Sequence, residues 1–139
     1  MRGMTLVELL VVVVVAAVLA MVAIPSYRSH VLRTHRVEAR TALLALAVAQ
    51  EKFFLQHNAY ATQAELSQAP PDGLGLAGTS ANSRYVLSIN GTSESDYSAT
   101  ATATGAQLAD IDCATLSTNA LGQRSATRID GSASNTCWH

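Results

Sequence analysis

Residues 9–24 of the chain read LLVVVVVAAVLAMVAI, sixteen aliphatic residues in succession. No charged residue occurs between positions 9 and 27, and a helix that crosses the hydrocarbon core of a bilayer needs about 20 apolar residues, within a range of about 17–25. A cleaved signal peptide is the alternative, but its apolar stretch has about 7–15 residues and ends at a small-residue cleavage site. This run is longer and is followed by Pro25-Ser26-Tyr27-Arg28. We therefore predict a membrane-spanning helix.

The composition as a whole fits one small domain attached to this helix. The 139 residues include 9 Lys+Arg and 10 Asp+Glu, charged residues make up 14 %, and hydrophobic residues make up 49 %. Disordered chains are rich in charge and poor in apolar residues, so this composition excludes disorder of the chain as a whole. A formal net charge of −1 also argues against a generally basic nucleic-acid-binding protein.

Glu8 stands directly before the apolar run, within residues 3–10 (GMTLVELL). A carboxylate at the edge of a membrane span costs a few kcal/mol unless another group pairs with it. This part of the chain resembles the signature of type IV prepilins. That signature has a short basic leader ending in glycine, then a glutamate at this spacing, then an aliphatic span. The resemblance implies that prepilin peptidase cuts between Gly3 and Met4, which removes residues 1–3 as a leader. It also implies that Met4 is N-methylated and that Glu8 pairs with the Met4 amine of a neighbouring subunit during assembly.

The helical pattern continues beyond the span. Pro25 predicts a kink, because proline cannot donate a backbone N–H and its ring clashes with the preceding turn. In pilins, a proline at this place marks where the helix bends during filament packing. A basic belt follows, which we interpret as a solvated face beside anionic lipid headgroups. It consists of Arg28, His30, Arg33, His35, Arg36 and Arg40, opposed by Glu38.

An amphipathic stripe then predicts that the helix packs on the rest of the chain. Apolar residues recur at three- and four-residue steps, and the helix is expected to end near His57-Asn58, since Asn suits a helix terminus. The stripe consists of Leu32, Ala39, Leu43, Leu46, Ala47, Phe53 and Phe54. A helix from residue 4 to residue 57 has a length of roughly 80 Å, more than a small domain covers. Its first half must pack in lipid or against other copies.

The residues after the helix predict a small β-rich region. Residues 62–65 (TQAE) fit a capping box that opens a short helical turn. Four later segments, separated by turn signals, read as strands at 84–90, 96–104, 113–118 and 123–129. We expect an antiparallel meander packed on the helix, which is an α+β fold.

The two cysteines, Cys113 and Cys137, are expected to form a disulfide in an exported domain. Closing a loop of about 25 residues contributes roughly 3–4 kcal/mol in the chain-entropy model. Together with His57 and His139 they lack the spacing of a zinc site, so no metal is expected. Asp110 and Asp112 flank Cys113 and are interpreted as solvated loop residues.

Beyond the span, the chain resembles PilE-type minor pilins of proteobacteria. The matching segments are 36–40, 50–54, 57–62, 97–104, 105–107 and Cys137-Trp138. The resemblance implies a pilin fold that follows the leader 1–3. Residues 4–27 would form the transmembrane and assembly half of the helix. Residues 28–139 would form the periplasmic globular domain, which includes the second half of the helix, 28–57.

The resemblance also implies a structural pilin subunit without enzymatic activity or a cofactor. It would lie in the bacterial inner membrane before assembly and in the extracellular pilus afterwards. Its implied partners are other pilin subunits, the inner membrane, prepilin peptidase and the pilus assembly platform. Its implied roles are pilus assembly, twitching motility, adhesion or DNA uptake. Two alternatives remain open: a pseudopilin of a type II secretion system, which shares the motif of residues 3–27, and a ComP-like DNA receptor in natural transformation.

The DNA alternative depends on local charge, because duplex binding needs basic groups that neutralise several phosphates. Residues 41–139 contain four basic and eight acidic residues, a net charge of −4. Arg124 and Arg128 are the candidate DNA contacts, as a small patch near Trp138 and His139. DNA is therefore a less favoured partner than other pilin subunits, and the structural role is the main prediction.

Overall fold

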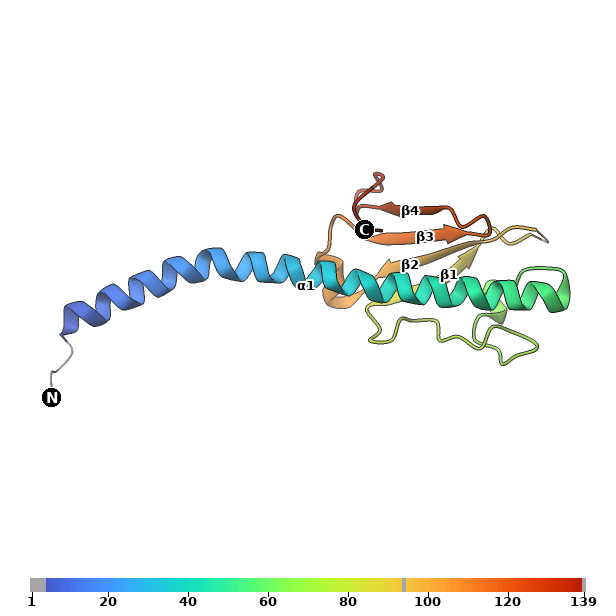
Figure 1. Ribbon diagram of the computed structural model, residues 1–139, viewed down its shortest axis with the longest axis horizontal. Coiled ribbons are helices and arrows are strands. Elements are labelled where there is room, and N and C mark those ends of the chain that lie inside the picture. The colour runs from blue at the N-terminus through green and yellow to red at the C-terminus, as the bar shows by residue number, and fades with distance from the viewer. Residues whose placement is uncertain (1–4, 94, 139) are drawn as a thin grey trace.

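The computed structural model describes residues 5–93 and 95–138, and it contains one long helix packed on one face of a four-stranded sheet (Figure 1). Helix α1 (Leu6–His57) has 52 residues, which corresponds to a length of about 78 Å. Thr5 caps its start by accepting a hydrogen bond from the Glu8 N–H at 3.3 Å. At its end Asn58 adopts a left-handed conformation, with φ of 53°, and donates its N–H to the Phe54 carbonyl at 2.8 Å. The predicted helix end at His57-Asn58 is confirmed.

The first half of α1 has no partner within the described chain. From residue 6 to residue 30 every side chain is exposed except the half-buried Ala20, and the apolar window that could span a membrane has no buried share. The helix is continuous through Pro25 and curves in this region (Figure 1). An apolar helix of this length in contact with water would be unfavourable, so its environment must come from lipid or other chains.

The second half of α1 packs on the sheet through one face. Ala39, Leu43, Leu46 and Phe53 are buried, as predicted, whereas Leu32, Ala47 and Phe54 are half-buried. Two polar residues, Arg36 and Gln50, occupy the same buried face. The Gln50 amide donates to the Ala61 carbonyl and accepts from the Ala61 N–H, each at 2.8 Å. This pair of bonds fixes the chain that turns back after the helix.

The four strands form an antiparallel meander in the order β1-β2-β3-β4, which confirms the prediction. Their predicted ends differ from the observed ones by at most two residues. Ala99, Ala101 and Ala103 point from β2 toward α1 and are buried, and these small side chains let the helix approach the sheet closely. The strands are β1 (Tyr85–Asn90), β2 (Ser98–Ala103), β3 (Thr115–Asn119) and β4 (Arg124–Thr127).

Two short turns and one disulfide complete the domain. Turn η1 (Gln63–Glu65) has the predicted capping box, in which the Glu65 carboxylate accepts from the Thr62 N–H at 2.6 Å. Turn η2 (Gly105–Ala109) follows β2. Cys113 and Cys137 form the predicted disulfide, with 5.7 Å between their Cα atoms, and both are fully buried. The bridge closes a loop that contains β3, β4 and the C-terminal tail.

Candidate functional site

Arg36 and Asp110 form an ion pair inside the domain. Nε and Nη2 of Arg36 donate to the two carboxylate oxygens of Asp110, each at 2.7 Å, and Arg36 is only 6 % exposed. The hydrogen bond with Asp110 raises the pKa of Arg36, against the burial that would lower it. Nη1 of Arg36 also donates to the Thr136 carbonyl at 3.4 Å. The guanidinium therefore joins α1 to both ends of the disulfide loop.

This pairing corrects two expectations from the sequence. Arg36 is not part of a solvated basic belt, and Asp110 is not a solvated loop residue. The two residues lie 74 positions apart, so no local pattern connects them. One signal was available, because Arg36 lies three residues before Ala39 and seven before Leu43, on the predicted apolar stripe.

Glu38 also binds within the domain instead of opposing the basic belt. Its carboxylate accepts from the Ser80 hydroxyl at 2.6 Å, the Asn82 N–H at 2.7 Å and Arg84 Nη1 at 2.7 Å. Burial alone would raise the pKa of Glu38, but these hydrogen bonds outweigh burial and lower the pKa to about 2. Glu38 therefore fixes the loop before β1 against α1.

The residues predicted for processing and assembly lie at the start of the chain. Gly3 and Met4 are outside the described residues. Glu8 is exposed in the first turn of α1, and no basic group within residues 5–93 and 95–138 lies at ion-pair distance from its carboxylate. A carboxylate in this position can accept a partner from outside the chain.

Arg124 and Trp138 line a groove between α1 and the β3–β4 hairpin. The guanidinium carbon of Arg124 lies 5.1 Å from the centroid of the Trp138 ring, within the range of cation–π attraction. Trp138 Nε1 donates to the Ser125 carbonyl at 2.8 Å, which fixes the ring against β4. Trp138 also follows Cys137 directly, so the disulfide fixes its backbone. The groove has a volume of about 130 Å³, and its α1 wall consists of Leu43, Leu44, Ala47 and Glu51.

The turn between β3 and β4 adds neutral hydrogen-bonding groups beside Arg124. Asn119 Nδ2 donates to Gln123 Oε1, and the Gln123 N–H donates to Asn119 Oδ1, both at 2.9 Å. The Ser117 and Ser125 hydroxyls bond each other at 2.8 Å across the neighbouring strands. Amides and hydroxyls of this kind contact phosphate and sugar in protein–nucleic-acid complexes.

The structure does not bring Arg128 to the same place as Arg124. Arg124 is the first residue of β4 and Arg128 follows its last residue, so the two lie about 13 Å apart along the strand at 3.3 Å per residue. Arg128 Nε lies 3.6 Å from Asp112 Oδ1, in an exposed ion pair. Arg128 therefore stays a prediction as a DNA contact, with its charge offset by Asp112, whereas no described carboxylate forms an ion pair with Arg124.

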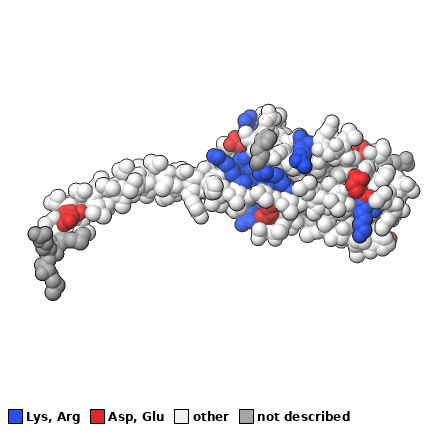
Figure 2. Space-filling view, in the orientation of Figure 1, with Lys and Arg blue, Asp and Glu red and all other residues white. Residues whose placement is uncertain are grey.

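Two arginines of α1 continue the wall of the groove toward the membrane span. Arg33, Arg40, Leu44 and Ala47 follow one another at steps of seven, four and three residues, which places them on one helix face. Arg33 is exposed, Arg40 is half-buried, and no described carboxylate pairs with either. Figure 2 shows Lys and Arg atoms gathered on one face where the globular domain begins. We call Arg33, Arg40 and Arg124 the basic strip.

The fold has the architecture of a type IV pilin. One half of a long helix is apolar and exposed, and the other half packs on an antiparallel meander that a disulfide bridges. The family model described as type IV minor pilin ComP, DNA uptake sequence receptor, matches residues 25–117. Because this match covers more than half of the chain, the chain belongs to that family of type IV minor pilins. It is a structural, non-enzymatic protein of a class found in membranes and pili. The matched residues include Arg33 and Arg40 and end before β4.

A relative with a curated name also belongs to the wider class of type IV pilins. The Type IV major pilin protein PilA of Myxococcus xanthus (strain DK1622) is 41% identical over 73 residues, which is 52% of this chain and 33% of PilA. The match therefore spans about a third of the length of that relative.

Two solved structures show the same fold. The non-core minor pilin PilV of Neisseria meningitidis aligns with a TM-score of 0.55 and 19% identity, over 77% of this chain and 97% of PilV. A type IV pilin from Shewanella oneidensis aligns with a TM-score of 0.51 and 22% identity, over 78% of this chain and 98% of that pilin.

Proposed function

We propose that this chain captures double-stranded DNA as a minor subunit of a type IV pilus. The observation that carries the proposal is the basic strip, in which Arg33 and Arg40 extend the α1 wall of the groove that contains Arg124. The family description, DNA uptake sequence receptor, supports a nucleic-acid ligand. The neutral amides of the β3–β4 turn and the hydroxyls of Ser117 and Ser125 on the two strands supply further groups for phosphate and sugar.

The charge distribution sets the expected strength of binding. Residues 41–139 carry a net charge of −4, but Arg33 and Arg40 belong to α1 and lie outside that count. Three arginines neutralise about three phosphates, and each phosphate contributes a slope of about −0.9 to the dependence of log affinity on log salt concentration. Binding should therefore weaken about 40-fold between about 50 and 200 mM salt. Several copies of the subunit in one filament would bind the same DNA molecule together, which would raise the overall affinity.

The proposal includes assembly into the filament. Prepilin peptidase cuts between Gly3 and Met4, Met4 is N-methylated, and Glu8 pairs with that amine on a neighbouring subunit. The subunit then passes from the bacterial inner membrane through the pilus assembly platform into the extracellular pilus. Support comes from the exposed apolar half of α1, from the Glu8 carboxylate, which pairs with no basic group among the described residues, and from the curve near Pro25, which lets the helix follow its neighbours.

The test is a titration of fluorescent duplex DNA with the full oxidised chain in detergent micelles, at low and at physiological salt. We expect salt-sensitive binding, and we expect Arg40→Gln and Arg124→Gln each to reduce the salt slope by about one. Lys52→Gln removes the same charge near the far end of α1 and should leave the slope unchanged. Binding that is absent at low salt, or equally weakened by all three variants, would contradict the proposal.

A further inference from the structure

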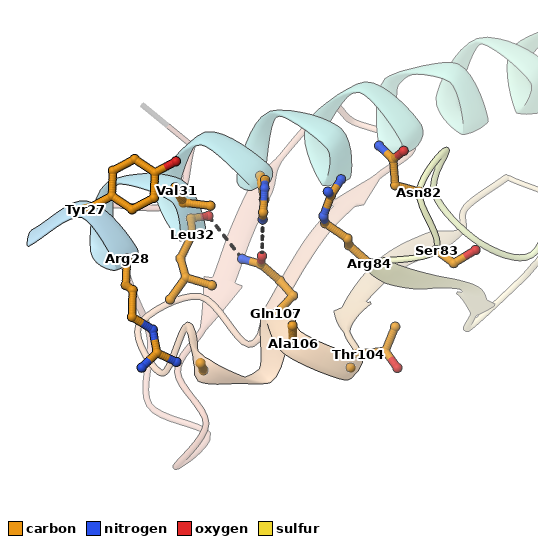
Figure 3. A pocket seen from close by; sticks show the side chains of 13 residues that line it. Tyr27, Arg28, Val31, Leu32, Asn82, Ser83, Arg84, Thr104, Ala106 and Gln107 are labelled. Atoms are coloured by element: carbon orange, nitrogen blue, oxygen red, sulfur yellow. Dashed lines mark hydrogen bonds between the residues drawn. The ribbon is translucent and has the colours of Figure 1, made fainter. Parts of the chain in front are cut away.

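A larger pocket lies where the globular domain meets the bare half of α1. It has a volume of about 440 Å³ and lies between α1, the loop before β1 and turn η2 (Figure 3). Tyr27, Arg28, Val31 and Leu32 share one helix face, and in Figure 3 Arg28 and Leu32 project from α1 toward η2. The pocket belongs to neither the basic strip nor the groove beside Trp138.

The position of the pocket relative to the membrane follows from the helix geometry. The aliphatic run ends at Ile24, and Arg28 and Leu32 lie about 6 and 12 Å further along the axis. The headgroup layer on each side of the hydrocarbon core is about 5–8 Å thick. When α1 spans the membrane, Tyr27 and Arg28 therefore lie at the level of the headgroups and the pocket opens directly above them. Tyrosine at this level is typical of membrane-interface anchors.

The lining combines apolar walls with one available cation. Val31 and Leu32 of α1 face Ala106 and Ala109 of η2, and no acidic residue is among the described residues that line the pocket. Arg28 is exposed and pairs with no described carboxylate.

The other two basic side chains of the pocket already have partners. Arg84 is bound by Glu38 at 2.7 Å, and His35 Nδ1 lies 3.1 Å from Gln107 Oε1. Gln107 is in turn fixed, because its amide donates to the Leu32 carbonyl at 3.1 Å. The walls are therefore preorganised, while the charge of Arg28 remains available to a ligand.

We propose that this pocket binds an anionic phospholipid of the leaflet from which α1 emerges. The lipid phosphate contacts the Arg28 guanidinium, the headgroup beyond the phosphate enters the pocket between Val31, Leu32 and Ala106, and the acyl chains run back along α1 past Tyr27 into the bilayer. Charge complementarity selects a net negative headgroup, and the aliphatic run that ends at Ile24 gives the acyl chains of the same lipid an apolar surface next to the pocket. The site would hold the subunit at a fixed depth in the membrane before it is assembled. It does not depend on DNA binding.

The test compares two lipids with identical acyl chains, phosphatidylglycerol and phosphatidylcholine, added in equal amounts to the full chain in neutral detergent. Native mass spectrometry counts the lipids retained by each protein molecule. We expect phosphatidylglycerol to be retained in preference, and Arg28→Gln to reduce that preference about fivefold, the effect of one basic residue at an anionic surface. Arg33→Gln removes the same charge from a neighbouring face that does not line the pocket and should change little.

A second variant tests the apolar walls. Ala106 is exposed, so Ala106→Phe should leave the domain folded while filling the pocket, and we expect it to reduce retention of both lipids. Equal retention of the two lipids by the unmodified chain would overturn the proposal, as would equal losses in Arg28→Gln and Arg33→Gln. Displacement of the lipid by glycerol phosphate alone would assign the site to a soluble phosphate ester. If the unmodified chain instead forms dimers without bound lipid, and Ala106→Phe abolishes these dimers, the pocket would be assigned to a second copy of the chain.

Discussion

The two halves of α1 belong to one continuous helix but differ in how much of their surface is buried. The first half is almost entirely aliphatic and buries nothing within the described chain, whereas the second half buries Ala39, Leu43 and Leu46 together with the polar Arg36 and Gln50. The more apolar half is thus the one without intramolecular partners. The stability of the domain therefore depends on the second half, while the first half contributes no buried contact to it within the described chain. We therefore expect substitutions that break contacts of the globular domain to lower its free energy of unfolding, and a substitution at Glu8 to leave it unchanged.

The largest effect should come from Arg36→Met, because it leaves the Asp110 carboxylate buried without its partner. Removal of one member of a buried pair costs about 3–5 kcal/mol. Chemical denaturation followed by the fluorescence of Trp138, the single tryptophan, measures the loss. The double variant Arg36→Met/Asp110→Leu is the control and should recover most of it, since no charge is then left unpaired. A single variant as stable as the unmodified chain would mean that water replaces the lost partner.

Loss of the disulfide should have a similar or slightly smaller effect. Replacement of Cys113 and Cys137 by serine removes a bridge across a loop of about 25 residues, which contributes about 3–4 kcal/mol in the chain-entropy model. The measurement is the Tm of the domain with and without the bridge. The Arg124–Trp138 contact should loosen as well, because Trp138 adjoins Cys137. An unchanged Tm would show that the bridge does not stabilise the domain.

Glu38→Gln should cost about 1.5–3 kcal/mol, the range for hydrogen bonds to a charged group. The effect should depend on pH, since the pKa of Glu38 is lowered from 4.5 to about 2 in the folded protein. A lowered pKa contributes stability that is present above about pH 4.5 and is lost as the pH falls toward 2. Denaturation curves across this window should therefore converge for the variant and the unmodified chain. Asp72→Asn, at an exposed carboxylate, should not reproduce this convergence.

Glu8→Ala should leave the free energy of unfolding of the domain unchanged, because Glu8 contacts none of it. Its effect should appear only in assembly: the protein should remain in the membrane fraction but be missing from sheared filaments. Normal recovery in filaments would remove Glu8 from the assembly mechanism. A loss of domain stability would contradict the separation between the two halves of α1.

Local patterns were sufficient to predict most of the fold. The aliphatic run, the helix end at Asn58, the capping box of residues 62–65 and the four strands all depend on residues close together in sequence. Only two cysteines were present, so their pairing followed once an exported domain was expected. The resemblance carried by Gly3, Glu8 and the span gave the class of protein, although Gly3 lies outside the described residues.

The sites were predicted less well than the fold. Counting charges over residues 41–139 suggested a patch of Arg124 and Arg128, because these two are near neighbours in sequence. In the structure Arg128 pairs with Asp112, while Arg124 lies across a groove from the α1 face that continues to Arg40, which lies far away in sequence. The prediction of a solvated basic belt was wrong for Arg36 and Glu38 for a similar reason. Their partners lie in the loops before β3 and β1, far from α1 in sequence.

Local sequence was enough to predict the apolar span, the end of the helix and the segments that form strands, because period, capping and turn preferences act over a few residues. Which charges are neutralised depends on tertiary contacts that no local pattern contains. Arg36 is paired with Asp110 and Arg84 with Glu38, whereas Arg28, Arg33 and Arg40 pair with no described carboxylate. The physical reason is that the free energy of a charge depends on its burial and its partners, and both are set by residues that folding brings together from distant parts of the chain.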